Sequence, residues 1–154
     1  MIDAHAHLAP DERGGPDQVH ELVATGAAGQ ALSIGSERIG HALSAVRDFY
    51  LMEELKERRI PLELNPTSNV RTGVCISYAD HPLKKYFKAG LLVTVNSDDP
   101  AFFGSDIANE YLLAYKEHGF TRDELRQLAA NSIEASFLPA PAKIEWLFRI
   151  DSTK

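Results

Sequence analysis

The clearest strand of the chain begins at Leu91, and residues 91–100 read Leu91-Leu92-Val93-Thr94-Val95-Asn96-Ser97-Asp98-Asp99-Pro100. Its first five positions contain β-branched Val and Thr residues, which favour an extended strand. The Asp-Asp-Pro sequence then ends the strand. Polar side chains therefore follow this strand directly, and parallel α/β folds place their ligand-binding groups at such strand ends.

The same order of strand, polar strand end and helix extends to both sides. Further strands are predicted at Met1–His5, Glu37–Gly40 and Ile60–Leu64, and residues 25–35 read as a loop or a weak helix. Helices are predicted at 16–24, 48–58, 82–89, 106–119, from Thr121 onward and from Pro141 onward. Alternating strands and helices indicate an α/β fold of parallel β/α units joined by right-handed crossovers.

The chain has 154 residues, a length that favours a single domain spanning 1–154. A complete (β/α)₈ barrel typically takes about 250 residues, so a complete barrel is excluded. Sixteen Lys and Arg against 22 Asp and Glu give a net charge of −6. This acidic balance argues against a nucleic-acid or anionic-membrane partner. The single cysteine, and the lack of a signal-peptide pattern or long apolar run, predict a cytoplasmic protein.

Two histidines near the start of the chain are candidate metal ligands. His5 and His7 are two residues apart, and in an extended strand such side chains point to the same side. Two imidazoles on one side can bind one metal ion. The alternative is a pair of exposed histidines near the chain terminus.

Three further candidates follow the later strands. Asp98 and Asp99 are adjacent carboxylates, which are costly at a strand end without a cation or a hydrogen-bonding ligand. One of them would bind a metal and the other would face a substrate, although Asp-Asp-Pro is also common turn chemistry. His41 follows Gly40 and is a candidate general base or electrostatic stabiliser. His20 and His118 lie in helical patterns typical of surface residues.

Taken together, four segments resemble the adenosine deaminase family of metal-dependent hydrolases. Ser36–His41 looks like the family's R-I-G-H-G segment, and Pro61–Asn69 looks like its E-x-x-P-T-S-N segment. Val93–Pro100 looks like its N-[ST]-D-D-P strand end, and Asn131–Phe137 looks like its late helix. The resemblance covers about three-quarters of the chain, from Arg38 to the C-terminus.

The resemblance implies a fold like the C-terminal half of a (β/α)₈ barrel, with one divalent metal ion, usually zinc. It implies hydrolytic deamination of adenosine or a related 6-aminopurine nucleoside by a metal-activated hydroxide. Asp98 would then bind the metal, Asp99 would contact the purine or orient the attacking water, and His41 would stabilise the developing charge. Aminodeoxyfutalosine deaminases share these motifs, and Gly40, where related adenine deaminases tend to carry Asp, favours a nucleoside.

The N-terminal region departs from the family's H-A-G-E segment. Glu12, which by resemblance would protonate the purine ring, keeps the family's spacing to a Gly-Pro turn, but the residue three positions before it is Ala9 rather than His. In one interpretation, His5 or His7 is the ligand and a short insertion precedes Glu12. In the other, Ile2–Leu8 resembles the family's first-strand H-x-H, joined directly to the second half.

A half-barrel exposes two strand edges and an apolar inner face, so self-association is expected. The expected small-molecule partner is a purine nucleoside. The alternative function is a non-catalytic half-barrel remnant that binds metal or purine without turnover. A cytidine-type zinc deaminase is excluded because that class needs two cysteine ligands.

Overall fold

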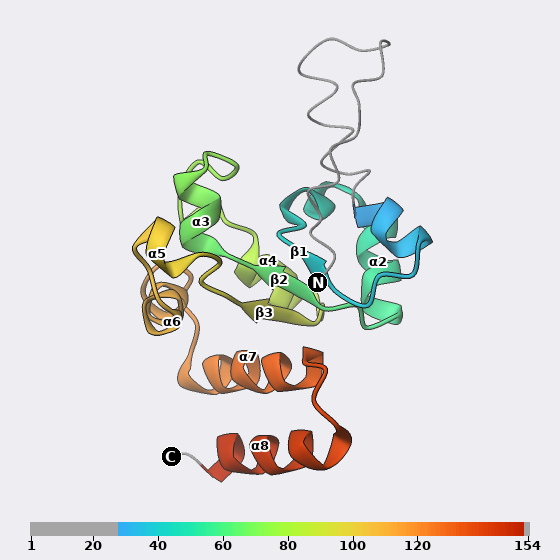
Figure 1. Ribbon diagram of the computed structural model, residues 1–154. Helices are drawn as coiled ribbons and strands as arrows, with labels where there is room; N and C mark the ends of the chain where they lie inside the picture. Colours follow the sequence, from blue (N-terminus) through green and yellow to red (C-terminus); the bar gives the residue numbers. More distant parts are fainter. Residues whose placement is uncertain (1–27, 153–154) are drawn as a thin grey trace.

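The computed structural model describes residues 28–152, which are built around a three-stranded sheet (Figure 1). The strands are β1 (Ile39–Gly40), β2 (Leu62–Leu64) and β3 (Val93–Val95), and β2 lies between the other two. Both pairings are parallel, and Leu62 is in register with Ile39 and Val93. The predicted parallel β/α arrangement is confirmed, whereas the strand at Met1–His5 and the helix at 16–24 lie outside the described residues.

Helices connect and cover the strands. They are η1 (Leu43–Arg47), α2 (Phe49–Glu57), α3 (Pro66–Arg71), α4 (Leu83–Lys88), α5 (Pro100–Phe103), α6 (Ile107–Lys116), α7 (Arg122–Ala135) and α8 (Ala140–Ser152). Residues 28–33 are also helical. The predicted α2, α4, α6, α7 and α8 are confirmed. The short α3 and α5 were not predicted; α3 begins after the one residue that follows β2, and α5 begins after the four residues that follow β3.

The starts of three helices are fixed by side chains that the sequence pattern identifies. Asp48 accepts a hydrogen bond from Leu51 N (3.0 Å) at the start of α2, and Asp106 accepts one from Asn109 N (2.8 Å) at the start of α6. Thr121 begins α7 with a reciprocal capping box to Glu124. Such caps satisfy backbone N–H groups that have no partner within the helix.

The core lies between the sheet and its covering helices, and α4 contributes its largest side chain. Tyr86 is fully buried, and its hydroxyl donates to the backbone carbonyls of Ala42 (2.8 Å) and Leu43 (2.9 Å). Burial raises the pKa of the Tyr86 phenol, so the group stays a neutral donor. The contact fixes the turn that follows β1 and therefore the position of the residue before it, His41.

The inward face of α6 carries a buried carboxylate beside the buried Ala114 and the partly buried Tyr111. Glu110 is fully buried, accepts from Thr67 N (3.1 Å) and accepts the hydroxyl proton of Ser105. Ile107 and Tyr115 are instead about half exposed, at 49% and 53%. The amphipathic pattern therefore located the helix, but Glu110 anchors it to the start of α3.

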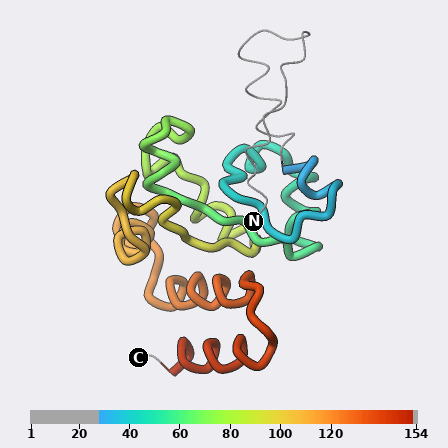
Figure 2. The backbone as a smooth tube through the Cα atoms, in the orientation of Figure 1, coloured from blue at the N-terminus to red at the C-terminus, as the bar shows by residue number. Residues whose placement is uncertain are grey.

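The last helix lies outermost. Figures 1 and 2 show α7 between the sheet and α8, and α7 contacts both β3 and α8. No residue of α8 is buried, and the residues that mark it as amphipathic, Ile144, Leu147 and Phe148, are exposed. No helix within residues 28–152 is long and apolar enough to cross a membrane.

Candidate functional site

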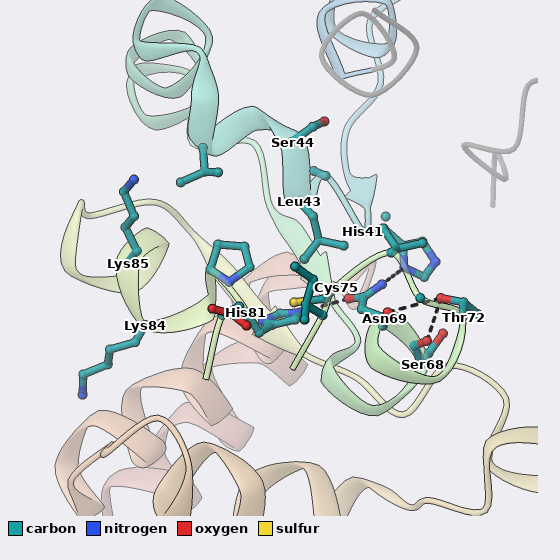
Figure 3. Close-up of a pocket in the computed structure, with 18 of the residues that line it drawn as sticks. His41, Leu43, Ser44, Ser68, Asn69, Thr72, Cys75, His81, Lys84 and Lys85 are labelled. Carbon is teal, nitrogen blue, oxygen red and sulfur yellow. Dashed lines mark hydrogen bonds between the residues drawn. The ribbon is translucent and has the colours of Figure 1, made fainter. Parts of the chain in front are cut away.

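The polar residues after the three strands meet at one edge of the sheet. His41 follows β1, the segment from Asn65 to Asn69 follows β2, and Asp98 follows β3. The strands are parallel, so their carboxyl ends lie at the same edge. His41, Ser68, Asn69 and Asp98 all line one open hollow, part of which Figure 3 shows.

His41 and Asp98 form the centre of this edge. The distance from His41 Nε2 to Asp98 Oδ2 is 4.0 Å, which is too long for a direct hydrogen bond. Ser68, from α3, donates its hydroxyl proton to the same Asp98 oxygen at 2.6 Å. Side chains from two other β/α units, His41 and Ser68, therefore approach the carboxylate that follows β3.

The backbone at both central residues is left-handed. His41 has φ +62° and Asp98 has φ +59°, in a region that non-glycine residues rarely occupy. The His41 N–H donates to the carbonyl of Glu63 at 2.8 Å, which extends the β1–β2 pairing up to the turn. Conformations of this kind tend to occur at functional sites, because the surrounding structure must hold them in place.

Two asparagines hold the imidazole of His41. The Nδ2 atom of Asn69 lies 2.8 Å from His41 Nδ1. The Nδ2 atom of Asn65 lies 3.1 Å from the same Nδ1 and 3.5 Å from Nε2. Both asparagines are buried, at 1% and 6% exposed, so the ring is positioned by amide groups fixed within the fold.

A second histidine lies behind Asn69. His81 is 4% exposed, and its Nε2 is 3.0 Å from Asn69 Oδ1, while the backbone N–H of Leu83 donates to His81 Nδ1 at 3.3 Å. Figure 3 shows the side chains of His41, Asn69 and His81 in a row. Burial, with the nearby His118 and His41, lowers the pKa of His81 to about 3, so the ring is neutral at physiological pH.

His81 was not among the site residues that the sequence predicted. Its partner Asn69 is 12 residues away, and nothing in a His-Pro pair indicates that contact. His118 was predicted to be a surface residue, and the structure shows it partly buried. Its ring packs against His81 with centroids 5.8 Å apart, and burial lowers its pKa.

Asp99 lies beside Asp98, but its side chain caps the helix that follows it. Its Oδ1 accepts from Phe102 N at 2.9 Å and caps the start of α5. A carboxylate has two oxygens, so this cap occupies only part of its accepting capacity. The structure thus separates the two adjacent carboxylates, with Asp98 facing His41 and Ser68 and Asp99 holding a helix.

The donor groups at this edge of the sheet decide whether the described residues alone can hold a metal ion. A catalytic zinc ion usually takes three protein ligands. Residues 28–152 contain no group of three His, Cys, Asp or Glu side chains that could hold a metal ion. Asp98 is a suitable oxygen donor, and its predicted partners His5 and His7, together with the predicted acid Glu12, lie outside the described residues.

Cys75 also lines the hollow, but its chemistry is not that of a nucleophile. It is buried, and its thiol donates to the carbonyl of Ser77 at 3.2 Å. Burial raises the pKa of the Cys75 thiol, so the thiolate is disfavoured.

Solved structures of barrel-type deaminases share this fold. An adenine deaminase from Arthrobacter aurescens superposes with a TM-score of 0.78 at 32% identity, over 94% of this chain and 50% of that one. An amidohydrolase from Burkholderia ambifaria with bound Zn gives a TM-score of 0.74 at 19% identity, over 93% and 47%. The predicted likeness to part of a (β/α)₈ barrel is thereby confirmed.

The chain belongs to the adenosine deaminase family, whose sequence model matches residues 1–153. An aminodeoxyfutalosine deaminase from Streptomyces coelicolor is 42% identical over 153 residues, which are 98% of this chain and 38% of that protein. An adenosine deaminase from Yersinia pseudotuberculosis is 39% identical over 132 residues, 86% of this chain and 37% of that protein. The chain thus spans little more than a third of the length of these relatives.

Proposed function

We propose that the chain carries the metal-binding carboxylate and the charge-stabilising histidine of a hydrolytic deaminase acting on adenosine or a related 6-aminopurine nucleoside. The observation that carries this proposal is the meeting of His41 and Asp98, from different strand ends, across 4.0 Å. Family membership and relatives named as deaminases of such compounds support it.

The proposed cofactor is one divalent metal ion, with zinc the preferred ion. Asp98 would hold it together with His5 and His7, because carboxylate and imidazole groups are ordinary zinc ligands. When bound, the ion lowers the pKa of a water molecule and supplies a nucleophile at neutral pH. Support comes from the exposed Asp98 carboxylate and from the zinc found in the B. ambifaria amidohydrolase.

The chain's own residues would orient and stabilise the reacting groups. Ser68 donates to Asp98 Oδ2 and so helps to hold the carboxylate in place. His41 faces the same hollow and would stabilise negative charge on the attacking oxygen. Glu12 would protonate the purine ring, and the free oxygen of Asp99 would contact the purine or orient the attacking water.

The proposed substrate class is a purine nucleoside rather than the free base. Gly40 precedes His41 and adds no charged side chain to the hollow. The two relatives act, by their names, on adenosine and on aminodeoxyfutalosine, whereas the A. aurescens neighbour is named an adenine deaminase. The three compounds therefore belong in one comparative assay.

We also propose that copies of the chain associate, because a sheet whose first and last strands are edges can pair further. In residues 28–152 these outer strands are β1 and β3. Such pairing would cover the open edges of a partial barrel.

An ultraviolet assay of adenosine-to-inosine conversion tests the proposed activity, with aminodeoxyfutalosine and adenine as further substrates and metal content measured on the same sample. Asp98→Asn should lower turnover by more than about 100-fold and release the metal. Asp123→Asn is the matched control, since that carboxylate lies on α7 with an 89% exposed side chain.

Three outcomes are informative. Turnover that depends on Asp98 supports the deaminase. Bound metal or purine without turnover supports the non-catalytic half-barrel. Protein that holds no metal, turns over none of the three compounds and gains no thermal stability from added Zn²⁺ contradicts the proposal, because a ligand of the folded state must raise its melting temperature.

A further inference from the structure

We infer that His81 is a positioning residue for His41: acting through Asn69, it fixes His41 as the tautomer that is protonated on Nε2 and bare on Nδ1. The inference rests on the proposed function for its chemical meaning. It is carried by a chain of hydrogen bonds that begins at a backbone N–H and ends at the hollow.

The direction of the chain is set at its buried end. The backbone N–H of Leu83 can only donate, so His81 Nδ1, at 3.3 Å, must accept. A neutral imidazole that accepts at one nitrogen carries its proton on the other. The Nε2–H of His81 therefore donates to Asn69 Oδ1 at 3.0 Å.

Asn69 passes the same donor-to-acceptor order of hydrogen bonds on to His41. Its oxygen is occupied by His81, so its amide nitrogen must face His41, where it lies 2.8 Å from Nδ1. An amide nitrogen only donates, and His41 Nδ1 is therefore an acceptor. The Nδ2 of Asn65 is a second donor that lies closer to His41 Nδ1 (3.1 Å) than to Nε2 (3.5 Å), so it favours acceptance at Nδ1 as well.

The tautomer of His41 decides which of its ring atoms can donate a hydrogen bond within the hollow. Neutral His41 then presents an N–H at Nε2, the atom that faces Asp98 Oδ2 across 4.0 Å. In this tautomer His41 is a hydrogen-bond donor toward an oxygen held between the two groups, and it is not a base toward that oxygen. Burial of both Asn69 and His81 keeps water from competing for these hydrogen bonds.

The test is nitrogen NMR of the histidine rings in the metal-free, ¹⁵N-labelled 154-residue chain at alkaline pH, where ordinary imidazoles are neutral. Long-range proton–nitrogen correlations show which ring nitrogen bears the proton, and a His41→Gln variant assigns the His41 signals. The expected result is a single His41 tautomer with the proton on Nε2. A His41 protonated on Nδ1 overturns the inference.

Variants separate positioning from mere stability. His81→Leu removes the donor to Asn69 and should convert the single tautomer into an averaged signal, whereas His81→Gln keeps an N–H donor and should retain it. His118→Leu, beside His81, is the control and should change nothing. A folded His81→Leu that keeps the pure Nε2–H tautomer overturns the role of His81.

Asn69→Asp supplies a second route that does not depend on the fold of His81→Leu. It replaces the donor to His41 Nδ1 by an acceptor of the same shape, so the proton of neutral His41 should move to Nδ1. An unchanged tautomer overturns the inference. Failure of the deaminase assay leaves these signals intact, so failure of the proposed function is distinguishable from failure of this inference.

Discussion

Burial leaves His81 without a favourable environment for a positive charge. The ring accepts from Leu83 N and contacts His118, and neither group stabilises a proton on it. Burial is the main reason that the pKa of His81 falls from its ordinary 6.5 to about 3. Protonation in this range therefore favours the unfolded chain, in which the imidazole is free to take up a proton.

The first prediction concerns pH and stability. At pH values above 6.5, His81 is neutral in both states and contributes no pH dependence. Between pH 6.5 and about 3, the unfolded chain binds a proton that the folded chain does not, so stability should fall as pH falls. The slope from one such group reaches about 1.4 kcal/mol per pH unit. Urea unfolding at pH 7 and pH 5 measures it.

His81→Gln is the matched variant for this measurement, because glutamine cannot titrate. Its stability should decline less between pH 7 and pH 5 than that of the parent chain. His118 adds a dependence of the same sign, because burial also lowers its pKa, and the variant retains that part. An identical decline in parent and variant would show that His81 is not the responsible group.

Residues of the site differ in how far a sequence can predict them. His41 and Asp98 follow strand ends and lie in recognisable motifs, so their meeting could be predicted. The contacts of Asn69 with His41 and His81 span 28 and 12 residues and depend on side-chain directions within the turn. Only the folded chain brings these groups together, and no local pattern indicates them.

At the scale of elements, α7 is held at its start by an arrangement that reaches across the fold. Thr121 and Glu124 cap each other's backbone N–H groups, and Lys84 from α4 donates to Glu124 Oε2 at 2.6 Å. Hydrogen bonds from Lys84 and Thr121 lower the pKa of Glu124. The capping box thus also connects α7 to α4.

The second prediction is that Thr121→Ala destabilises the protein by about 1 kcal/mol, the usual cost of losing a helix N-cap. Thr121→Ser is the control, because it keeps the hydroxyl that accepts from Glu124 N. Urea unfolding should separate the two variants. Equal stabilities of the alanine and serine variants would contradict the capping role of Thr121.

Two elements show why secondary structure was only partly predictable. Pro66 and Pro100 each follow a strand. Each is also the first residue of a short helix, α3 or α5. Proline suits the first helical position as well as it ends a strand. Helices of six and four residues are too short to show a helical period of apolar residues. The sequence could therefore not show that each proline also begins a helix.

At the scale of the whole molecule, residues 28–152 expose the outer strands of the sheet and an apolar helix surface. Its sheet ends at β1 and β3, and the outermost helix α8 presents Ile144 at 69% and Phe148 at 72% exposed. Large apolar side chains gathered on one surface favour association. The expectation from sequence rested on the strand edges and the apolar inner face of a half-barrel, and the exposure of α8 adds a further surface.

The third prediction is that the chain self-associates, measured as a concentration-dependent rise in mass by sedimentation velocity. Ile144→Lys combined with Phe148→Lys should weaken association if α8 contributes to the contact. Asp151→Lys, an exposed position on the same helix, controls for added charge. A monomer over the whole concentration range would contradict the prediction.

The contact between the Glu110 carboxylate and the Thr67 amide joins positions 43 residues apart. Contacts of such separation require a long loop to close, and loop closure slows folding. The segment carrying Ser68 and Asn69 cannot gain its anchor before α6 has docked. A growing chain can complete this edge only after residue 110 has been synthesised, so the order of synthesis becomes part of how the site is assembled.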